Sequence, residues 1–143
     1  MEAIGSSDDL EGCTILLVED DAIAAIDMRN VLEMAGAKVL GPAYSLGQGF
    51  HLLDDAPIDC ALLDINLNSL VVFGLADALA ERKVPIVFLS ADTLDRAPSQ
   101  HRTGRLVHKP FSTHTLIRAV RATIAEKRNH TEGHPELSLS PSI

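Results

Sequence analysis

The chain has 143 residues, of which 46% are hydrophobic, and a net charge of −8 at pH 7. This length and apolar content suit one domain with a substantial core and leave little room for a second. The acidic balance argues against nucleic acid binding through bulk charge, and no apolar run is long enough for membrane insertion. The acidic, polar N-terminus is unlike a signal peptide. Cys13 and Cys60 lie in apolar runs, so we expect reduced core thiols in a cytoplasmic protein.

Five short apolar runs recur along the chain, each mostly continuous, as is typical of strands covered on both faces. In chain order they are residues 14–18, 38–43, 58–63, 85–90 and 105–108. Helix-like stretches follow the first, second, third and fifth runs. In the same order they are residues 21–36, 45–55, 70–83 and 112–128. Between the fourth and fifth runs, residues 91–104 carry Pro98 in their middle, so we expect only a short or irregular helix there.

The helix-like stretches carry recognisable end signals. The first is expected to end at Gly36, and the second begins at Ser45, a good N-cap, although two glycines weaken it. The last is the clearest, because Ser112 caps it and its apolar residues are spaced by four. The apolar residues at helical spacing in the first helix are Ile23, Ile26, Val31 and Met34, and those in the last are Leu116, Val120 and Ile124.

The alternation of strands and helices predicts an α/β fold: a doubly wound parallel sheet of five strands, with helices on both faces and right-handed crossovers. We expect the folded domain to span residues 12–128. Residues 1–11 and 129–143 are expected to be a flexible extension and a flexible tail, because they are polar and have little to bury. Neither flank is long enough to be an output domain.

Chemistry-bearing residues follow several of the predicted strands, and in a doubly wound sheet such strand ends form the functional edge. They are Glu19, Asp20 and Asp21 after the first strand, Asp64 after the third, Ser90 after the fourth and Lys109 after the fifth. Carboxylates in this number suit Mg²⁺. Without a cation they should repel one another and raise a carboxylate pKa. Asp64, flanked by a metal, Lys109 and Ser90, is also equipped to attack a phosphoryl group and form an acyl phosphate.

Four motifs taken together, "VEDD", "LLDINL", "FLSA" and "HKPF", each end a strand in this order. From about Cys13 to Lys127 the chain resembles the receiver domain of bacterial two-component response regulators, in outline a stand-alone one. The resemblance implies a flavodoxin-like strand order 2-1-3-4-5 and Mg²⁺ or Mn²⁺ as cofactor. It also implies a partner that donates phosphate, either a sensor histidine kinase or a histidine phosphotransfer protein.

The resemblance also implies a role for each site residue. Glu19 and Asp20 are similar to the metal-binding acidic pair, Asp64 to the phosphorylated aspartate, Ser90 to the switch residue and Lys109 to the phosphate lysine. The backbone carbonyl of Asn66 would be a further metal ligand, and Lys109–Pro110 a cis peptide bond. Asp21 is interpreted as the N-cap of the first helix only. His51, His101 and His114 are interpreted as surface residues, and His108 as a structural or surface residue.

One departure from the family concerns signal output. The family usually has Tyr or Phe three residues before the lysine, where this chain has Leu106. We therefore expect phosphorylation to reorder residues 91–104 instead, and to expose or reshape a basic face formed with residues 105–128 that docks an acidic protein. Residues 96–128 carry eight Lys or Arg and one acid. Arg118 and Arg121 belong to this expected face.

Two alternative functions remain open at this point. One is a pseudo-receiver, a protein-binding module that is never phosphorylated, although every chemical residue is present. The other is an enzyme of the haloacid dehalogenase type, which also forms an aspartyl phosphate. Such an enzyme needs an aspartate two residues after its nucleophile as acid and base, and here that residue is Asn66. We therefore expect no catalysis beyond phosphorylation and dephosphorylation of the chain's own aspartate.

Overall fold

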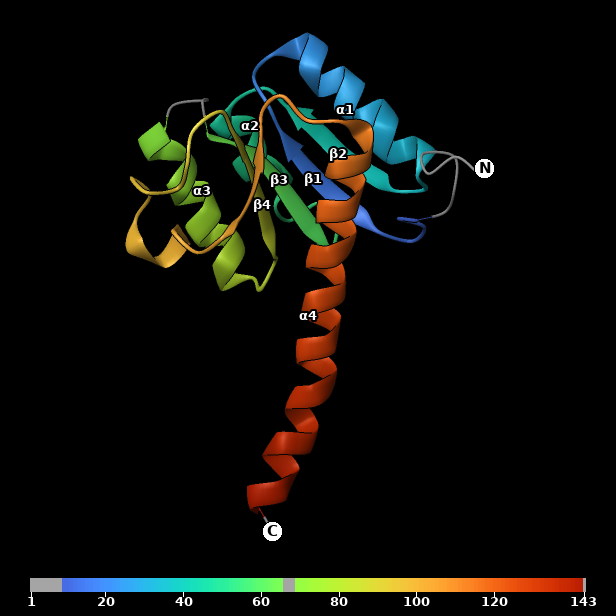
Figure 1. Cartoon of the computed structure of the whole chain (residues 1–143), viewed down its shortest axis with the longest axis vertical. Coiled ribbons are helices and arrows are strands. Elements are labelled where there is room, and N and C mark those ends of the chain that lie inside the picture. The colour runs from blue at the N-terminus through green and yellow to red at the C-terminus, as the bar shows by residue number, and fades with distance from the viewer. Residues whose placement is uncertain (1–8, 66–68, 143) are drawn as a thin grey trace.

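In a computed structural model of the chain, the described residues are 9–65 and 69–142, with only the backbone described at 69–71 and 130–142. The strands are β1 (Thr14–Val18), β2 (Lys38–Ala43), β3 (Cys60–Asp64), β4 (Ile86–Ser90) and β5 (Arg105–His108). The helices are α1 (Ala22–Met34), α2 (Leu46–Leu52), α3 (Ser69–Glu81), the 3-10 helix η3 (Ser99–His101) and α4 (Thr113–Ser142). Figure 1 shows their arrangement.

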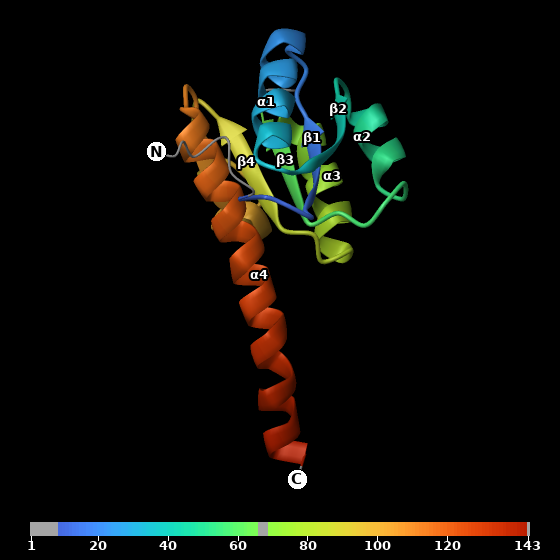
Figure 2. The ribbon, with the colours of Figure 1, turned by 90° about the vertical axis from the view of Figure 1, so that its right-hand side faces the viewer.

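All five strands are parallel and lie in the order β2-β1-β3-β4-β5. This confirms the predicted doubly wound α/β sheet. The strands read as continuous apolar runs because both faces of the sheet are covered. α1 and α4 pack on one face, and α2 and α3 on the other (Figure 2). The first core contains Ile15, Leu17, Met28, Leu32, Leu116 and Val120, and the second contains Leu16, Val18, Leu63, Leu75 and Phe88.

α1 buries a different face from the one that the spacing of Ile23, Ile26 and Met34 indicates. Ile23 and Met34 are 77% and 66% exposed, whereas Met28 and Leu32 are buried against the sheet together with Ala25. Two apolar arcs compete on this helix, and the arc with the smaller side chain of Ala25 is the one that faces the sheet. Gly36, one residue beyond the C-cap, has a φ of +101°, which explains why a glycine ends the helix.

The two cysteines are free and buried, as predicted. Burial raises the pKa of Cys60 to about 12, so this thiol stays protonated at neutral pH. Across the described part of the chain, no helix combines the length and the apolar character that a membrane crossing requires.

β5 lies between an irregular segment and a long helix. Residues 91–104 form turns and the short η3, in agreement with the expected irregular helix. α4, however, continues past residue 128 to Ser142 and projects beyond the sheet (Figure 1). Apolar periodicity marks only the part of a helix that packs, whereas each further residue can propagate the backbone hydrogen bonds without a core. α4 thus runs through residues 129–142 of the predicted flexible tail. The flexibility of that tail and the domain limits at 12 and 128 remain predictions.

Candidate functional site

The site forms where β1 and β3 end side by side. Val18 pairs with Leu63 in the parallel register of the two strands. The next residues, Glu19 and Asp64, are therefore neighbours at the carboxyl edge of the sheet. Their burial follows from the same geometry, because helices cover the strands on both faces: the side chains of Glu19 and Asp64 are each only 1% exposed.

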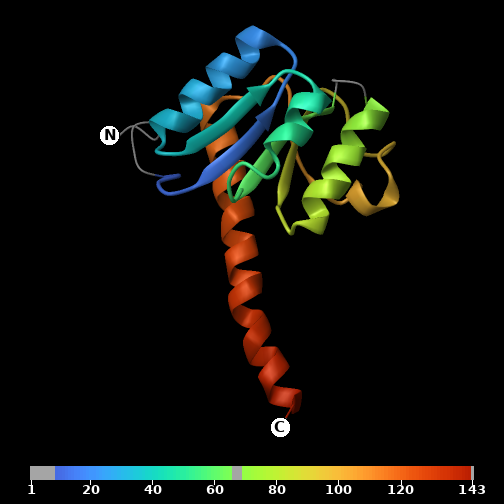
Figure 3. The ribbon, with the colours of Figure 1, turned by 180° about the vertical axis from the view of Figure 1, so that it is seen from behind.

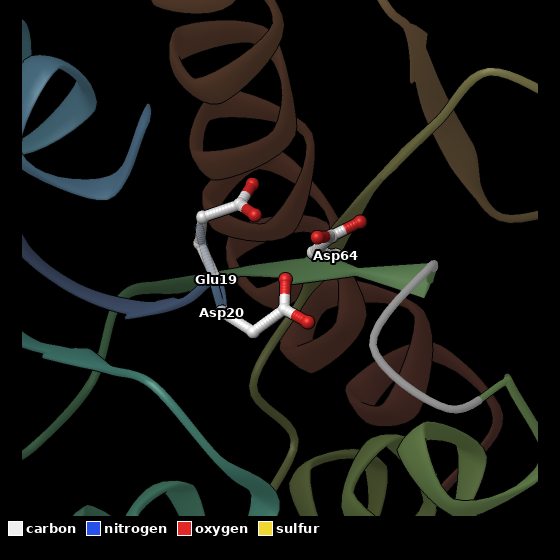
Figure 4. A group of neighbouring side chains, drawn as sticks. All are labelled: Glu19, Asp20 and Asp64. Atoms are coloured by element: carbon white, nitrogen blue, oxygen red, sulfur yellow. The ribbon is translucent and has the colours of Figure 1, made fainter. Parts of the chain in front are cut away.

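Three carboxylates meet at this edge. Glu19, Asp20 and Asp64 each offer an oxygen that lies within 4.8 Å of the other two, and their side chains gather around one space (Figure 4). Asp20 is exposed, so the group is open to solvent on one side. Three hard oxygen donors with an open side fit Mg²⁺, which keeps several water ligands. Asn66, expected to add a backbone carbonyl, lies outside the described residues.

Lys109 supplies the positive charge beside these carboxylates. Its Nζ lies 3.1 Å from Asp64 Oδ1 and 3.4 Å from Glu19 Oε1. Partial burial by itself would lower the pKa of the ammonium group, but the hydrogen bond and charge of Asp64, with those of Glu19, outweigh it and raise the pKa. Lys109 is thus held in its charged form, paired with both buried carboxylates.

A single ammonium group does not balance the cluster. The pKa of Glu19 rises to about 7, first because the carboxyl is buried and then because it lies against Asp64. The backbone N–H of Asp21, 3.2 Å from Glu19 Oε2, and the charge of Lys109 oppose this rise only in part. A raised carboxylate pKa was expected here, although burial contributes more to it than repulsion does. A further positive charge would therefore stabilise the ionised form of the cluster.

The remaining predicted residues take distinct positions. Asp21 caps α1, accepting hydrogen bonds from the backbone N–H groups of Ile23 and Ala24 at 3.0 and 3.2 Å, as interpreted from the sequence. Ser90 is buried at the end of β4, and its Oγ accepts a hydrogen bond from the N–H of Asp92 at 2.9 Å. The Lys109–Pro110 peptide bond is cis, as expected.

A pocket of about 630 Å³ opens beside the cluster, between α1 and the segment that leads into α4. Glu19, Lys109, Met28 and Phe111 are among its lining residues. It leaves an approach to the cluster from solvent, which matters for a site that must meet a phosphodonor. The pocket could not be predicted from the sequence, because its walls come from two parts of the chain, residues 19–31 and residues 91–116, that are far apart in sequence.

His101 was predicted to be a surface residue, and this is wrong. It is buried at 6% exposure, with its ring between Phe73 and Phe88. A histidine in a polar, proline-containing segment gives no signal of burial, because the partners that enclose it lie on α3 and β4. The predicted surface positions of His51 and His114 are confirmed, and His108, interpreted as structural or surface, is exposed.

Comparison with known proteins identifies the family. A family model described as "Response regulator receiver domain" matches residues 15–121. The chain belongs to this receiver domain family. Among curated relatives, it is 30% identical over 139 residues to the transcriptional regulatory protein CpxR of Escherichia coli, and 27% identical over 122 residues to PdtaR of Mycobacterium tuberculosis. These alignments cover 90% and 82% of this chain but 59% of either relative, so the chain spans little more than half of each.

Solved structures agree on the fold. A CheY-like receiver domain from Methanospirillum hungatei matches with a TM-score of 0.72 and 21% identity, over 82% of this chain and 98% of its own. SdrG from Pseudomonas melonis, solved in its "BeF3-activated conformation", matches with a TM-score of 0.66 and 29% identity, over 78% and 95%. The chain thus contains the receiver domain of a two-component response regulator. Such domains act in phosphorylation-based signalling with histidine kinases or phosphotransfer proteins, and bind Mg²⁺ at an acidic pocket.

Proposed function

We propose that Asp64 is the phospho-acceptor of this receiver, and that its phosphorylation controls binding to, or phosphotransfer with, a partner protein in the cytoplasm. One observation carries the proposal. The Asp64 carboxylate is buried at the end of β3, 3.1 Å from the Lys109 ammonium group, with Glu19 and Asp20 oxygens within 4.8 Å. A buried carboxylate beside an ammonium group and a candidate metal site is a candidate nucleophile.

The proposed donor is a phosphohistidine of a histidine kinase or of a histidine phosphotransfer protein. An oxygen of Asp64 attacks the phosphorus atom; a P–O bond forms as the P–N bond breaks. The leaving imidazole nitrogen keeps the electron pair and takes up a proton. The product is an acyl phosphate on Asp64, and attack of water on the phosphorus later returns the carboxylate and inorganic phosphate. Apart from these reactions of its own aspartate, the proposal includes no enzymatic activity.

Residues of this chain would assist the transfer electrostatically. Glu19, Asp20 and Asp64, with the backbone carbonyl of Asn66, would hold Mg²⁺ or Mn²⁺. Held there, such a metal would supply positive charge to the phosphoryl oxygens. The ammonium group of Lys109 is paired with Asp64 in this structure and would pair with a phosphoryl oxygen after the transfer. The Ser90 hydroxyl, one strand away, would donate a hydrogen bond to another phosphoryl oxygen.

The output partner is proposed to be an acidic protein that docks through residues 91–128. Ion pairs within the chain reduce the positive charge that this region offers to such a partner. Arg105 pairs with Glu126, and Arg121 lies 3.7 Å from Asp9, so part of the positive charge is neutralised within the chain. Arg118 is exposed, and its guanidinium group lies 3.4 Å from His114 Nε2. Attraction between exposed charges should weaken as salt exceeds ~0.15 M, where the Debye length is ~8 Å.

Intact-protein mass spectrometry tests the acceptor directly. With a small phosphodonor such as acetyl phosphate and Mg²⁺, the wild type should gain one phosphoryl group, and chelation of the metal should prevent it. Asp64→Asn should gain none, whereas the control Asp95→Asn, an exposed carboxylate of the 91–104 segment, should label as the wild type does. Undiminished labelling of Asp64→Asn would refute the assignment. An unlabelled wild type would instead favour the pseudo-receiver function.

A further inference from the structure

Residues 91–104 lie against α3 and β4 in place of a regular helix (Figure 3). Three of them, Leu94, Ala97 and His101, are buried, and the first two belong to the core on the α3 side of the sheet. The segment has few backbone hydrogen bonds of its own, so its position depends on these side chains. Segments held in this way reorder at low cost in free energy.

His101 makes the most specific of these contacts. Its ring stacks on Phe73 of α3, with centroids 5.5 Å apart and planes at 23°, and meets Phe88 of β4 edge-on at 5.8 Å. Its Nε2 lies 2.7 Å from Oδ1 of Asp77 on α3. A carboxylate oxygen can only accept, so Nε2 carries the proton and donates. One side chain thereby joins the segment, α3 and β4.

Asp77 is suited to accept this bond. Gln100 donates to the same oxygen at 3.2 Å. Hydrogen bonds from His101 and Gln100 lower the pKa of the Asp77 carboxyl, which is therefore ionised at neutral pH. Gly104 completes the fit, because a Cβ at that position would lie 3.1 Å from both Phe88 Cε2 and the His101 carbonyl oxygen. The segment packs closely on Phe88 at its far end.

The near end of the segment is bonded to the proposed switch residue. Ser90 Oγ accepts the N–H of Asp92 at 2.9 Å. Rotation of the Ser90 side chain toward a phosphoryl group on Asp64 would carry Oγ away from this N–H. The chain between Asp92 and His101 would then lose its first anchor while the second still holds. The anchored segment therefore opposes the rotation of Ser90.

We propose that His101, bonded to Asp77 and packed between Phe73 and Phe88, is a positioning residue that latches residues 91–104 in the unphosphorylated state and is released on phosphorylation. This inference rests on the proposed function, because it names how the Asp64 site is regulated. It also accounts for Leu106, since the aromatic contact in this region comes from the segment and not from residue 106. Because coupling between two sites is reciprocal, a weakened latch must favour the phosphorylated state.

Beryllofluoride, a phosphoryl analogue, provides the test. Its affinity in the presence of Mg²⁺ is measured by titration, and hydrogen exchange at residues 92–101 is followed with and without it. Asp77→Ala removes the acceptor from a half-exposed position, and His101→Phe keeps the ring but loses the N–H donor. Both variants should bind beryllofluoride about fivefold more tightly than the wild type, the low end of typical coupling between sites. Both should exchange faster at 92–101 even without it.

Asp95→Ala is the matched control, because it removes an exposed carboxylate of the same segment that is not part of the latch. It should behave as the wild type does. Simple damage to the fold would weaken binding of the analogue, so tighter binding separates a latch from a merely structural contact. Unchanged or weaker binding by both latch variants, with a wild type that binds, would overturn this inference alone. A wild type that does not bind beryllofluoride would overturn the proposed function as well.

Discussion

At the scale of single residues, the site is defined by an imbalance of charge. Glu19 and Asp64 are both buried, and Lys109 is the ammonium group that contacts them among the described residues. The raised pKa of Glu19 reflects the free-energy cost of ionising a buried carboxyl that lies against Asp64. Binding of a divalent cation relieves the same cost, so protonation of Glu19 and metal binding should compete.

This imbalance predicts how stability depends on pH without metal. Glu19 has a pKa of about 7 in the folded protein, against its ordinary value of 4.5, so the folded state keeps a proton that the unfolded state loses first. The contribution of Glu19 is full below about pH 4.5 and is lost as pH rises to about 7. The loss should be at most about 3 kcal/mol.

Urea unfolding with chelator at several pH values measures this dependence. Glu19→Gln is the control, since it keeps the size of the side chain but cannot ionise. The difference in free energy of unfolding between the wild type and Glu19→Gln should change in favour of the variant as pH rises. Added Mg²⁺ should restore the wild type above pH 7. A difference that is flat between pH 4.5 and 7 would contradict the raised pKa.

At the scale of elements, α2 shows how a helix with two glycines is retained. Gly49 is buried, and a Cβ there would lie 2.9 Å from Leu75 Cδ2 and 3.4 Å from Val18 Cγ2. The glycine lets α2 approach α3 and β1 closely. Gly47 has only Ser45 Oγ near such a Cβ, at 3.9 Å. Close packing therefore requires a glycine at position 49 and does not require one at position 47.

The same substitution at these two positions should have opposite effects. Gly49→Ala should reduce the free energy of unfolding by about 1–3 kcal/mol, because the methyl group overpacks the contact with Leu75. Gly47→Ala should raise it by about 0.5 kcal/mol, because alanine loses less backbone entropy on forming a helix. Thermal and urea unfolding of both variants gives the comparison. Equal effects would show that α2 moves away freely and that its packing is not close.

At the scale of the whole molecule, α4 serves two parts of the structure. Its first turns belong to the core through Leu116, Ile117, Val120 and Ile124. Its last turns extend beyond the sheet (Figure 1). The stability of the domain should therefore depend on the first part only, which is consistent with the predicted domain limit at residue 128.

Removal of residues 129–143 should change the free energy of unfolding by no more than about 0.5 kcal/mol, as for surface changes. Ile124→Ala in the full chain should cost about 2–5 kcal/mol, because it leaves a cavity where α4 packs on the sheet. Chemical denaturation of both proteins tests the boundary. If the truncation costs as much as Ile124→Ala, the last turns take part in the fold and the predicted limit must move.

Much of this protein could be predicted from local pattern. Continuous apolar runs indicate buried parallel strands, and parallel strands bring their carboxyl ends to one edge of the sheet. The sequence alone therefore predicts that Glu19, Asp64 and Lys109 lie close together. The N-caps at Asp21 and Ser45 depend on the nearest backbone N–H groups and were also predictable. These features depend on strand order and on residues a few positions apart.

Only the tertiary structure decided the features that depend on distant partners. The sheet determines which face of α1 is buried: Ala25, Met28 and Leu32 pack against it, and Ile23 does not. His101 is buried because Phe73, Asp77 and Phe88, which lie 13 to 28 residues earlier, enclose it. The pKa of Glu19 likewise depends on desolvation by helices from across the chain. Sequence determines which groups are present and which edge they reach, whereas packing determines which of them lose contact with water.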